Sequence, residues 1–360
     1  MRVIISAGGT GGHIYPALAI LNKIKEKEPN SEFLYIGTHN RMEKDIIPKH
    51  NIPYEEIEIY GFNRKNLLKN FKTISCLVKA SKKCKKIIKD FDPDIVIGVG
   101  GYVTAPVIKT AKKLGYKTFI HEQNSVIGAS NKYLTNYADL IGVSFESSKQ
   151  FFPKDKVIFC GNPCSEDAYN IKEADKKEFG LSDKKPLVLF VMGSLGASTV
   201  NSFLIKTMSL FNNKDYEILY VTGNSDYERI MENKFPKNVK VVPYIDKMTR
   251  IMKKADIIVT RAGASTLAEV IALKLPSIII PSPYVTNNHQ FKNAKDLVDN
   301  NAAIMIEEKD LKSDIIVRNI DEMLRNKNIL ENMKKNLEGM QVKNSATIIY
   351  DNLKKLIDRK

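Results

Sequence analysis

The stretch RVIISAGGTGGHIYPALAI, residues 2–20, sets the pattern for the whole chain. It begins with a short apolar run, continues with four glycines among residues 8–12, and ends in helical spacing that includes Pro16. Glycines let the backbone bend tightly and approach a ligand, and the unpaired amides at a helix N-terminus attract an oxyanion. The stretch therefore predicts a strand, a ligand-binding glycine loop and a helix.

The same alternation recurs in two series. The first series predicts strands at 2–7, 32–37, 94–98 and 118–121, and the second predicts strands at 187–191, 217–221, 239–242, 256–259, 277–280 and 303–306. Apolar strands that alternate with helices indicate parallel sheets covered on both faces. We expect an α/β protein with two doubly wound, Rossmann-like domains and a ligand cleft between them.

At 360 residues the chain is long enough for two domains, and the charged stretch 165–186 separates the two series. We expect an N-terminal domain over 1–164 and a C-terminal domain over 165–342. The segment 343–360 has helical spacing and no following strand, so we expect it to pack back on the first domain.

The composition, 43% hydrophobic and 27% charged, is that of a soluble globular protein. The start of the chain lacks the features of a signal peptide, and no apolar run approaches the ~20 residues of a spanning helix. Cys76, Cys84, Cys160 and Cys164 form no metal-binding or disulfide pattern. These features predict a cytoplasmic location with reduced thiols.

The net charge of +15 is concentrated in residues 64–89, which hold ten Lys or Arg and no acid. This pattern predicts an interfacial helix facing anionic lipid headgroups. The alternative is a solvated helix whose apolar stripe belongs to the core. The expected membrane contacts are Leu67, Leu68, Phe71, Lys72, Lys82, Lys83 and Lys86.

Two further glycine loops follow predicted strands, at 98–106 and 193–197. A single loop of this kind is weak information. An NAD site would also require an acidic residue at the end of the second strand, where this chain has Tyr35 to His39, and this argues against a dehydrogenase. Three such loops, two in one domain and one in the other, fit a diphosphate ligand bound between the domains better than they fit a single cofactor site.

The most informative stretch is RAGASTLAEVIALKLPSIIIPSPYVTNNHQFKNA, residues 261–294. A helix opens near Ala264, so the hydroxyls of Ser265 and Thr266 and the free amides can bind phosphate. Glu269, one turn later, can accept hydrogen bonds from ribose hydroxyls. A capped helix with a solvated glutamate is the alternative.

Taken together, these segments resemble the MurG family across nearly the whole chain. The likeness rests on GGTGGHIYPALAI (8–20), GVGGYVTAP (98–106), HEQNSVIGASNK (121–132), GNP (161–163), RAGASTLAE (261–269) and NNHQFKNA (287–294). The resemblance implies a GT-B fold and inverting, β-1,4-forming transfer of N-acetylglucosamine from UDP-GlcNAc to undecaprenyl-diphospho-MurNAc-pentapeptide in peptidoglycan synthesis. It also implies attachment to the cytoplasmic face of the membrane.

The resemblance also assigns the residues of the site. Donor binding is carried over to Thr10, Gly11, Gly12, Asn124, Ser165, Ser194, Ile245, Arg261, Ala264, Ser265, Thr266, Glu269 and Gln290. Among these, Arg261 is expected to help shape its loop. Binding of the acceptor diphosphate is assigned to Gly9, Thr10, Gly100, Gly101 and Tyr102. Asn124 is also expected to contact the acceptor. His13 leads as general base because a neutral imidazole can take a hydroxyl proton, and Glu122 is the rival. The alternative for His13 is a histidine that fixes the loop by hydrogen bonding.

The chain departs from the family pattern at two positions. Ser165 stands where the family usually has Arg, and Leu195 stands where it usually has Gln. Losing a charge-assisted contact weakens donor binding by about 1.5–3 kcal/mol unless another group substitutes.

We predict no metal site and no required cofactor, with a divalent cation at most stimulatory. The DxD pattern at 90–94 precedes a strand and is interpreted as a solvated turn. The expected partners are the two substrates, an anionic inner-membrane surface and cell-wall synthesis proteins, without nucleic acid. The alternatives are a related glycolipid synthase, a UDP-sugar epimerase, or a non-catalytic nucleotide-sugar-binding scaffold.

Overall fold

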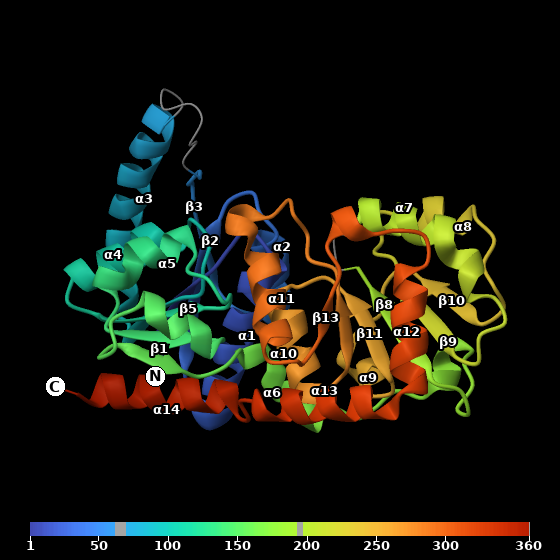
Figure 1. Ribbon diagram of the computed structural model, residues 1–360. Helices are drawn as coiled ribbons and strands as arrows, with labels where there is room; N and C mark the ends of the chain where they lie inside the picture. Colours follow the sequence, from blue (N-terminus) through green and yellow to red (C-terminus); the bar gives the residue numbers. More distant parts are fainter. Residues whose placement is uncertain (62–69, 193–196, 360) are drawn as a thin grey trace. The chain divides into compact units, whose positions relative to one another are not determined.

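The computed structural model describes residues 1–61, 70–192 and 197–359, with the side chains of 70–72 and 74 outside the description. The chain divides into two compact units (Figure 1). Unit 1 comprises Met1–Cys164 and Asn344–Lys360, and unit 2 comprises Ser165–Lys343. The division falls where the charged stretch led us to expect it.

Unit 1 is built on a seven-stranded parallel sheet in the order β3-β2-β1-β4-β5-β6-β7. Its strands are β1 (Arg2–Ser6), β2 (Glu32–Thr38), β3 (Tyr54–Ile57), β4 (Ile95–Gly98), β5 (Lys117–Glu122), β6 (Leu140–Val143) and β7 (Val157–Phe159). Its helices are α1 (Gly11–Lys27), α2 (Glu43–Ile46), α3 (Asn70–Phe91), α4 (Thr104–Lys113), α5 (Ala129–Leu134) and α14 (Ser345–Asp358). Strand order reverses between β1 and β4, which is where ligands bind in such sheets.

Burial on both faces explains the continuous apolar strands of unit 1. On β1, Val3 and Ile5 join a core cluster with residues of α1 and α14, whereas Ile4 joins a second cluster with residues of α3 and α4. Successive side chains of a strand point to opposite faces, so both faces of β1 must be apolar. The C-terminal helix α14 lies against α1 and closes one of these faces (Figure 1).

Unit 2 repeats the plan with a six-stranded parallel sheet in the order β10-β9-β8-β11-β12-β13. Its strands are β8 (Leu187–Val191), β9 (Glu217–Val221), β10 (Val239–Val242), β11 (Ile257–Thr260), β12 (Ser277–Ile279) and β13 (Ile304–Met305). Its helices are α6 (Glu166–Asn170), α7 (Ser198–Thr207), α8 (Tyr227–Met231), α9 (Thr249–Met252), α10 (Ala264–Leu273), α11 (His289–Asp299), α12 (Ile315–Arg325) and α13 (Lys327–Gly339). The predicted pair of doubly wound domains is thereby confirmed.

Two details differ from the sequence-based expectation. The strands β3, β6 and β7 were not predicted, because runs of only three or four residues carry too little periodicity. The charged stretch 165–186 is also no loose linker. It contains α6, and the Lys253 ammonium donates to the Ile171 carbonyl at 2.7 Å, which ties the stretch to unit 2.

The basic helix α3 packs one face on unit 1 and leaves its lysines in solvent. Cys76, Ala80, Cys84 and Ile88 are buried at helical spacing, and Leu77 packs against the same cluster. One apolar face of this part of α3 therefore belongs to the core of unit 1, whereas Val78 is 53% exposed. Lys82, Lys85 and Lys86 are exposed on the remaining surface.

The membrane contacts expected on α3 have different outcomes. The Lys83 side chain is 47% exposed, and its ammonium donates to the Glu56 carbonyl at 2.7 Å and pairs with Glu55 at 3.4 Å, so its contact with a membrane stays a prediction. Leu67 and Leu68 lie outside the described residues, as do the side chains of Phe71 and Lys72. Among the described helices, none is both long and apolar enough to cross a bilayer.

Candidate functional site

The first glycine loop of unit 1, residues 8–12, turns sharply from β1 into α1. Gly9 has a φ of +93°, a left-handed value that side chains strongly disfavour. Thr10 is the N-cap of α1, and its side chain makes no capping hydrogen bond. The first-turn amides of α1 are thus not capped by Thr10, as an anion site at a helix N-terminus requires.

The second glycine loop, residues 98–101, is in backbone contact with the first. The Gly8 amide donates to the Gly100 carbonyl at 3.1 Å. A Cβ added to Gly101 would lie 2.5 Å from the Gly8 oxygen, so only glycine fits there. The structure therefore brings the predicted acceptor glycines together as one assembly.

His13 sits at the junction of these loops. Its Nδ1 lies 2.9 Å from the Gly8 carbonyl oxygen. Because a carbonyl only accepts, Nδ1 carries the proton and the lone pair of the neutral ring is on Nε2. The ring also packs on Gly100, where an added Cβ would lie 2.6 Å from Cδ2. This tautomer is the one a general base working through Nε2 needs.

Tyr102, another expected acceptor residue, is 58% exposed. Its ring covers Gly61, where an added Cβ would lie only 2.6 Å from the ring. The ring therefore presents an aromatic surface beside the second glycine loop.

Glu122, the rival base, is almost fully buried at the carboxyl end of β5. One carboxylate oxygen accepts from the Asn124 amide at 3.1 Å and from the Asn124 side chain at 3.2 Å. The other accepts from the Gly128 amide at 2.8 Å and from the Asn131 side chain at 2.9 Å. Four donors thus converge on a carboxylate that is 2% exposed, which fits an anchor for the loop after β5 better than a base.

His121, which precedes Glu122, is also a structural group. Its Nε2 donates to the Gly161 carbonyl at 3.1 Å, and its Nδ1 faces the Gln123 side-chain nitrogen at 3.0 Å. Burial lowers the pKa of His121 to about 4, so the ring stays neutral at physiological pH. Gln123 also donates to the Val99 carbonyl at 3.0 Å and joins this loop to the second glycine loop.

In unit 2, the start of α10 has the expected form of an anion site. Gly263 is the N-cap, and no side chain caps the helix. Among the described residues, the buried hydroxyl of Ser265 makes no hydrogen bond. Ala264 and Thr266 occupy the same first turn. Unpaired amides and a spare hydroxyl are suited to phosphate oxygens.

Arg261 is committed to protein contacts at the base of this loop. Its guanidinium donates to the Ile280 carbonyl at 3.0 Å and pairs with Glu308 at 2.5 Å. Both side chains are at least 89% buried, with 11% and 7% exposed. Arg261 therefore joins the end of β11 to the end of β12 rather than offering its charge to a ligand.

Glu269 lies one turn further along α10. Burial of its carboxyl raises its pKa to about 8, although part of the residue remains exposed. At neutral pH, the unliganded protein thus holds this group mostly protonated. A perturbed carboxyl beside an uncapped helix N-terminus is typical of a functional site.

The remaining described donor residues of unit 2 are Gln290 in the first turn of α11, Ile245 on the loop after β10, and Ser165 at the N-cap of α6. The Gln290 side-chain oxygen accepts from the Ser282 amide at 2.9 Å and fixes the turn after β12. Ile245 follows β10 and is 9% exposed. Ser165, in place of the family's Arg, is 5% exposed at the start of α6. Ser194 and Leu195 lie outside the described residues.

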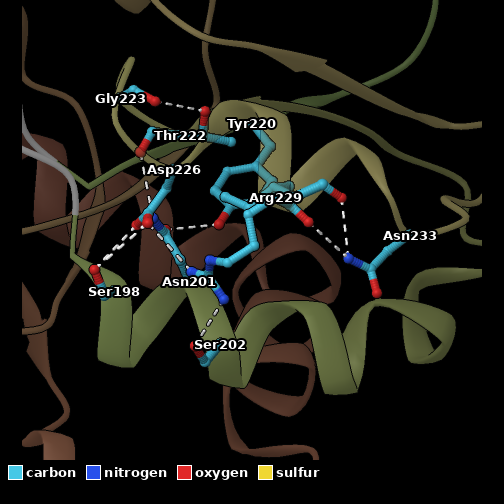
Figure 2. A network of polar contacts seen from close by, with 10 residues as sticks. Ser198, Asn201, Ser202, Tyr220, Thr222, Gly223, Asp226, Arg229 and Asn233 are labelled. Carbon is cyan, nitrogen blue, oxygen red and sulfur yellow. Dashed lines mark hydrogen bonds and ion pairs between the residues drawn. The ribbon is translucent and has the colours of Figure 1, made fainter.

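A buried polar network in unit 2 was not predicted (Figure 2). Asn201 donates to the Asp226 carboxylate at 2.6 Å and accepts from the Tyr220 hydroxyl at 2.7 Å. The Arg229 guanidinium lies 3.3 Å from Asp226, and the Ser198 hydroxyl donates to the same carboxylate at 3.3 Å. The network anchors the first turn of α7 to the end of β9. Only contacts between distant residues reveal it.

Glu43 of unit 1 was also missed. It follows β2 at the same sheet edge as the glycine loops, and the polar cluster that begins at His39 is the signal that could have pointed to it.

No group of three or more His, Cys, Asp or Glu side chains within the described ranges is arranged to hold a metal ion. In the DxD pattern, Asp94 accepts from the Arg2 amide at 2.7 Å and Asp92 accepts from the Tyr116 hydroxyl at 2.9 Å. These carboxylates lie before β4, at the end of the sheet opposite the glycine loops.

Comparison with known proteins agrees with this geometry. The glycosyltransferase family 28 N-terminal domain matches residues 3–143, and the family's C-terminal domain matches residues 187–349. A Bacillus cytotoxicus protein named UDP-N-acetylglucosamine–N-acetylmuramyl-(pentapeptide) pyrophosphoryl-undecaprenol N-acetylglucosamine transferase is 46% identical over the full length of both chains.

The protein of the same name from Bacillus subtilis is 43% identical over 99% of each chain. The crystal structure of Acinetobacter baumannii MurG matches with a TM-score of 0.79 and 27% identity, over 98% of this chain and 99% of that one. The chain therefore belongs to glycosyltransferase family 28, among its MurG-type N-acetylglucosamine transferases.

Proposed function

We propose that this protein transfers N-acetylglucosamine from UDP-N-acetylglucosamine to undecaprenyl-diphospho-N-acetylmuramoyl-pentapeptide. The full-length identity to transferases of that name supports the activity and disfavours the glycolipid synthase, the epimerase and the scaffold. The observation that carries the chemistry is the tautomer of His13, whose Nε2 holds the lone pair at the junction of two glycine loops.

The donor binds to unit 2 in this proposal. The uncapped start of α10, with the Ser265 hydroxyl, receives the diphosphate, and the carboxyl of Glu269 receives the ribose hydroxyls. Helix N-termini stabilise anions through their amides and dipole. The same amides stabilise the negative charge that develops on UDP as it leaves, so the transfer needs no metal ion. We therefore expect the protein to remain active when a metal chelator is added to the assay.

The acceptor diphosphate binds to the joined glycine loops of unit 1, with Tyr102 beside it. In the reaction, the acceptor hydroxyl oxygen forms a bond to C1 of the hexosamine. The bond from C1 to the UDP oxygen breaks, and its electron pair leaves with UDP. The hydroxyl proton passes to Nε2 of His13.

We also place the protein at the cytoplasmic face of the membrane, held by the exposed lysines of α3. Lys82, Lys85 and Lys86 are available in solvent, and each lysine near an anionic surface contributes ~1 kcal/mol of binding. The acceptor is linked to a membrane lipid, and the unit proposed to bind it carries a basic surface. A basic surface on that unit would hold it close to the membrane that contains the acceptor. The attachment is peripheral and depends on ionic strength.

The decisive assay measures UDP release from UDP-N-acetylglucosamine with a short-chain, soluble lipid-diphosphate acceptor. His13→Ala is expected to lower kcat at least 100-fold, within the usual range for a general base. His50→Ala, an exposed histidine of unit 1, is the matched control. No UDP release from the wild-type protein would refute the function. Full turnover in His13→Ala would refute only its role as base.

A further inference from the structure

Glu43 lies directly behind the first glycine loop, as the first residue of α2, and is fully buried. One carboxylate oxygen accepts from the Thr38 amide at 3.1 Å and from the Thr38 hydroxyl at 2.7 Å. The other accepts from the Gly9 amide at 3.1 Å. Among the described residues, no Lys or Arg forms an ion pair with it. The carboxylate is thus held by donors from the end of β2 and from the first glycine loop.

We propose that Glu43 is a positioning residue of the transfer reaction, which sets the first glycine loop through the Gly9 amide and thereby places His13 for the acceptor. The inference rests on the proposed binding of the acceptor to unit 1.

Glu43 is connected to His13 through residues 8 and 9 of the first glycine loop, which it contacts directly. Gly8 has no side chain, and a Cβ there would lie 2.4 Å from the Glu43 carboxylate, so the loop rests on the carboxylate itself. The Gly8 carbonyl accepts from His13, and the Gly8 amide donates to the Gly100 carbonyl. A displacement of residues 8–9 would therefore move both the imidazole and the second glycine loop.

The chemistry explains why a carboxylate is used. Burying an anion without a cation is unfavourable, and a neutral side chain could satisfy Thr38 with less desolvation. A glutamine, however, has one acceptor oxygen and a donating amide nitrogen, so it cannot accept from both Thr38 and Gly9 in this arrangement. The Gly9 amide donates to Glu43, so we expect the acceptor diphosphate to bind through other amides of the two glycine loops, such as those of Thr10 and Gly101.

The test compares Glu43→Gln with two matched variants, using the soluble acceptor so that membrane binding plays no part. Asp139→Asn alters a carboxylate of unit 1 that also accepts from the amide and hydroxyl of one threonine, Thr118, at 3.0 and 2.9 Å. Asp139 lies before β6, at the opposite end of the sheet. Thr38→Val removes one hydrogen bond to Glu43 and leaves Gly9 untouched.

We expect Glu43→Gln to lower kcat/KM for the acceptor about tenfold while KM for UDP-N-acetylglucosamine changes less than twofold. Thr38→Val and Asp139→Asn should lower the melting temperature and leave acceptor kinetics within twofold. If Glu43→Gln does not fold, Glu43→Asp, which keeps the charge but shortens the reach, should show the same selective loss.

Unchanged acceptor kinetics in a folded Glu43 variant, or an equal loss in the two control variants, would overturn the proposal. The Tyr102→Ala variant distinguishes a failure of the Glu43 proposal from a failure of the proposed acceptor site on unit 1. If Tyr102→Ala also leaves acceptor kinetics unchanged, then the placement of the acceptor on unit 1 has failed.

Discussion

Replacing Glu122 with Gln decides between the two base candidates that the sequence left open. The substitution keeps the shape of the side chain and removes its charge. Each carboxylate oxygen accepts two hydrogen bonds. One oxygen accepts from the backbone and side-chain amides of Asn124, and the other accepts from the Gly128 amide and the Asn131 side chain. Whichever way the new amide turns, its nitrogen faces two donors, which lose their acceptor.

The magnitude follows from this geometry. A buried donor left without an acceptor costs about 1–3 kcal/mol, so two of them destabilise unit 1 by about 2–4 kcal/mol after partial relaxation. For a unit of roughly 180 residues, 1 kcal/mol lowers the melting temperature by about 2–4 °C. We therefore expect the melting temperature of unit 1 to fall by about 4–16 °C.

The assay combines calorimetry with a pH–rate profile. As an anchor, Glu122→Gln should retain turnover at temperatures where it is folded and keep the acid limb of kcat against pH, whereas His13→Ala should lose that limb. The reasoning is refuted if Glu122→Gln melts within 1 °C of wild type and its kcat falls 1,000-fold. That result would make Glu122 the base.

Three further predictions concern donor binding, the polar network and the membrane. The pKa of Glu269 is raised from 4.5 to about 8, so Glu269 favours the folded state fully below pH 4.5, and this contribution is lost as pH rises through 8. If its carboxylate binds ribose, KM for the donor should fall from pH 6 to 8 in wild type and stay flat in Glu269→Gln. Tyr220→Phe leaves the buried Asn201 oxygen unpaired and should lower unfolding free energy by about 1–2 kcal/mol in urea titrations, with unchanged stability contradicting the network. Changing Lys82, Lys85 and Lys86 to Gln should abolish sedimentation with anionic vesicles, and the same change at Lys309, Lys334 and Lys335 of unit 2 should not. Equal losses in both sets would indicate a non-specific charge effect.

The sequence predicted the architecture because its information is local. Apolar runs followed by glycines, as at 2–12, require a buried parallel strand and a tight turn, and both series of such runs formed sheets. The motif 261–269 likewise predicted a helix start, because an uncapped N-terminus is a property of a few adjacent residues. The short strand β3 was not predicted, because an edge strand of four residues has too little hydrophobic periodicity to be recognised.

The roles of polar residues depended on distance, which the sequence does not contain. The partners of Arg261, namely the Ile280 carbonyl and the Glu308 carboxylate, could be found only in the tertiary structure. The sequence alone determined two doubly wound domains and the family of the chain. Only the tertiary structure put Glu43 beneath Gly9, surrounded Glu122 with four donors and assigned the His13 lone pair to Nε2, because hydrogen bonds join atoms that folding brings together from separate loops.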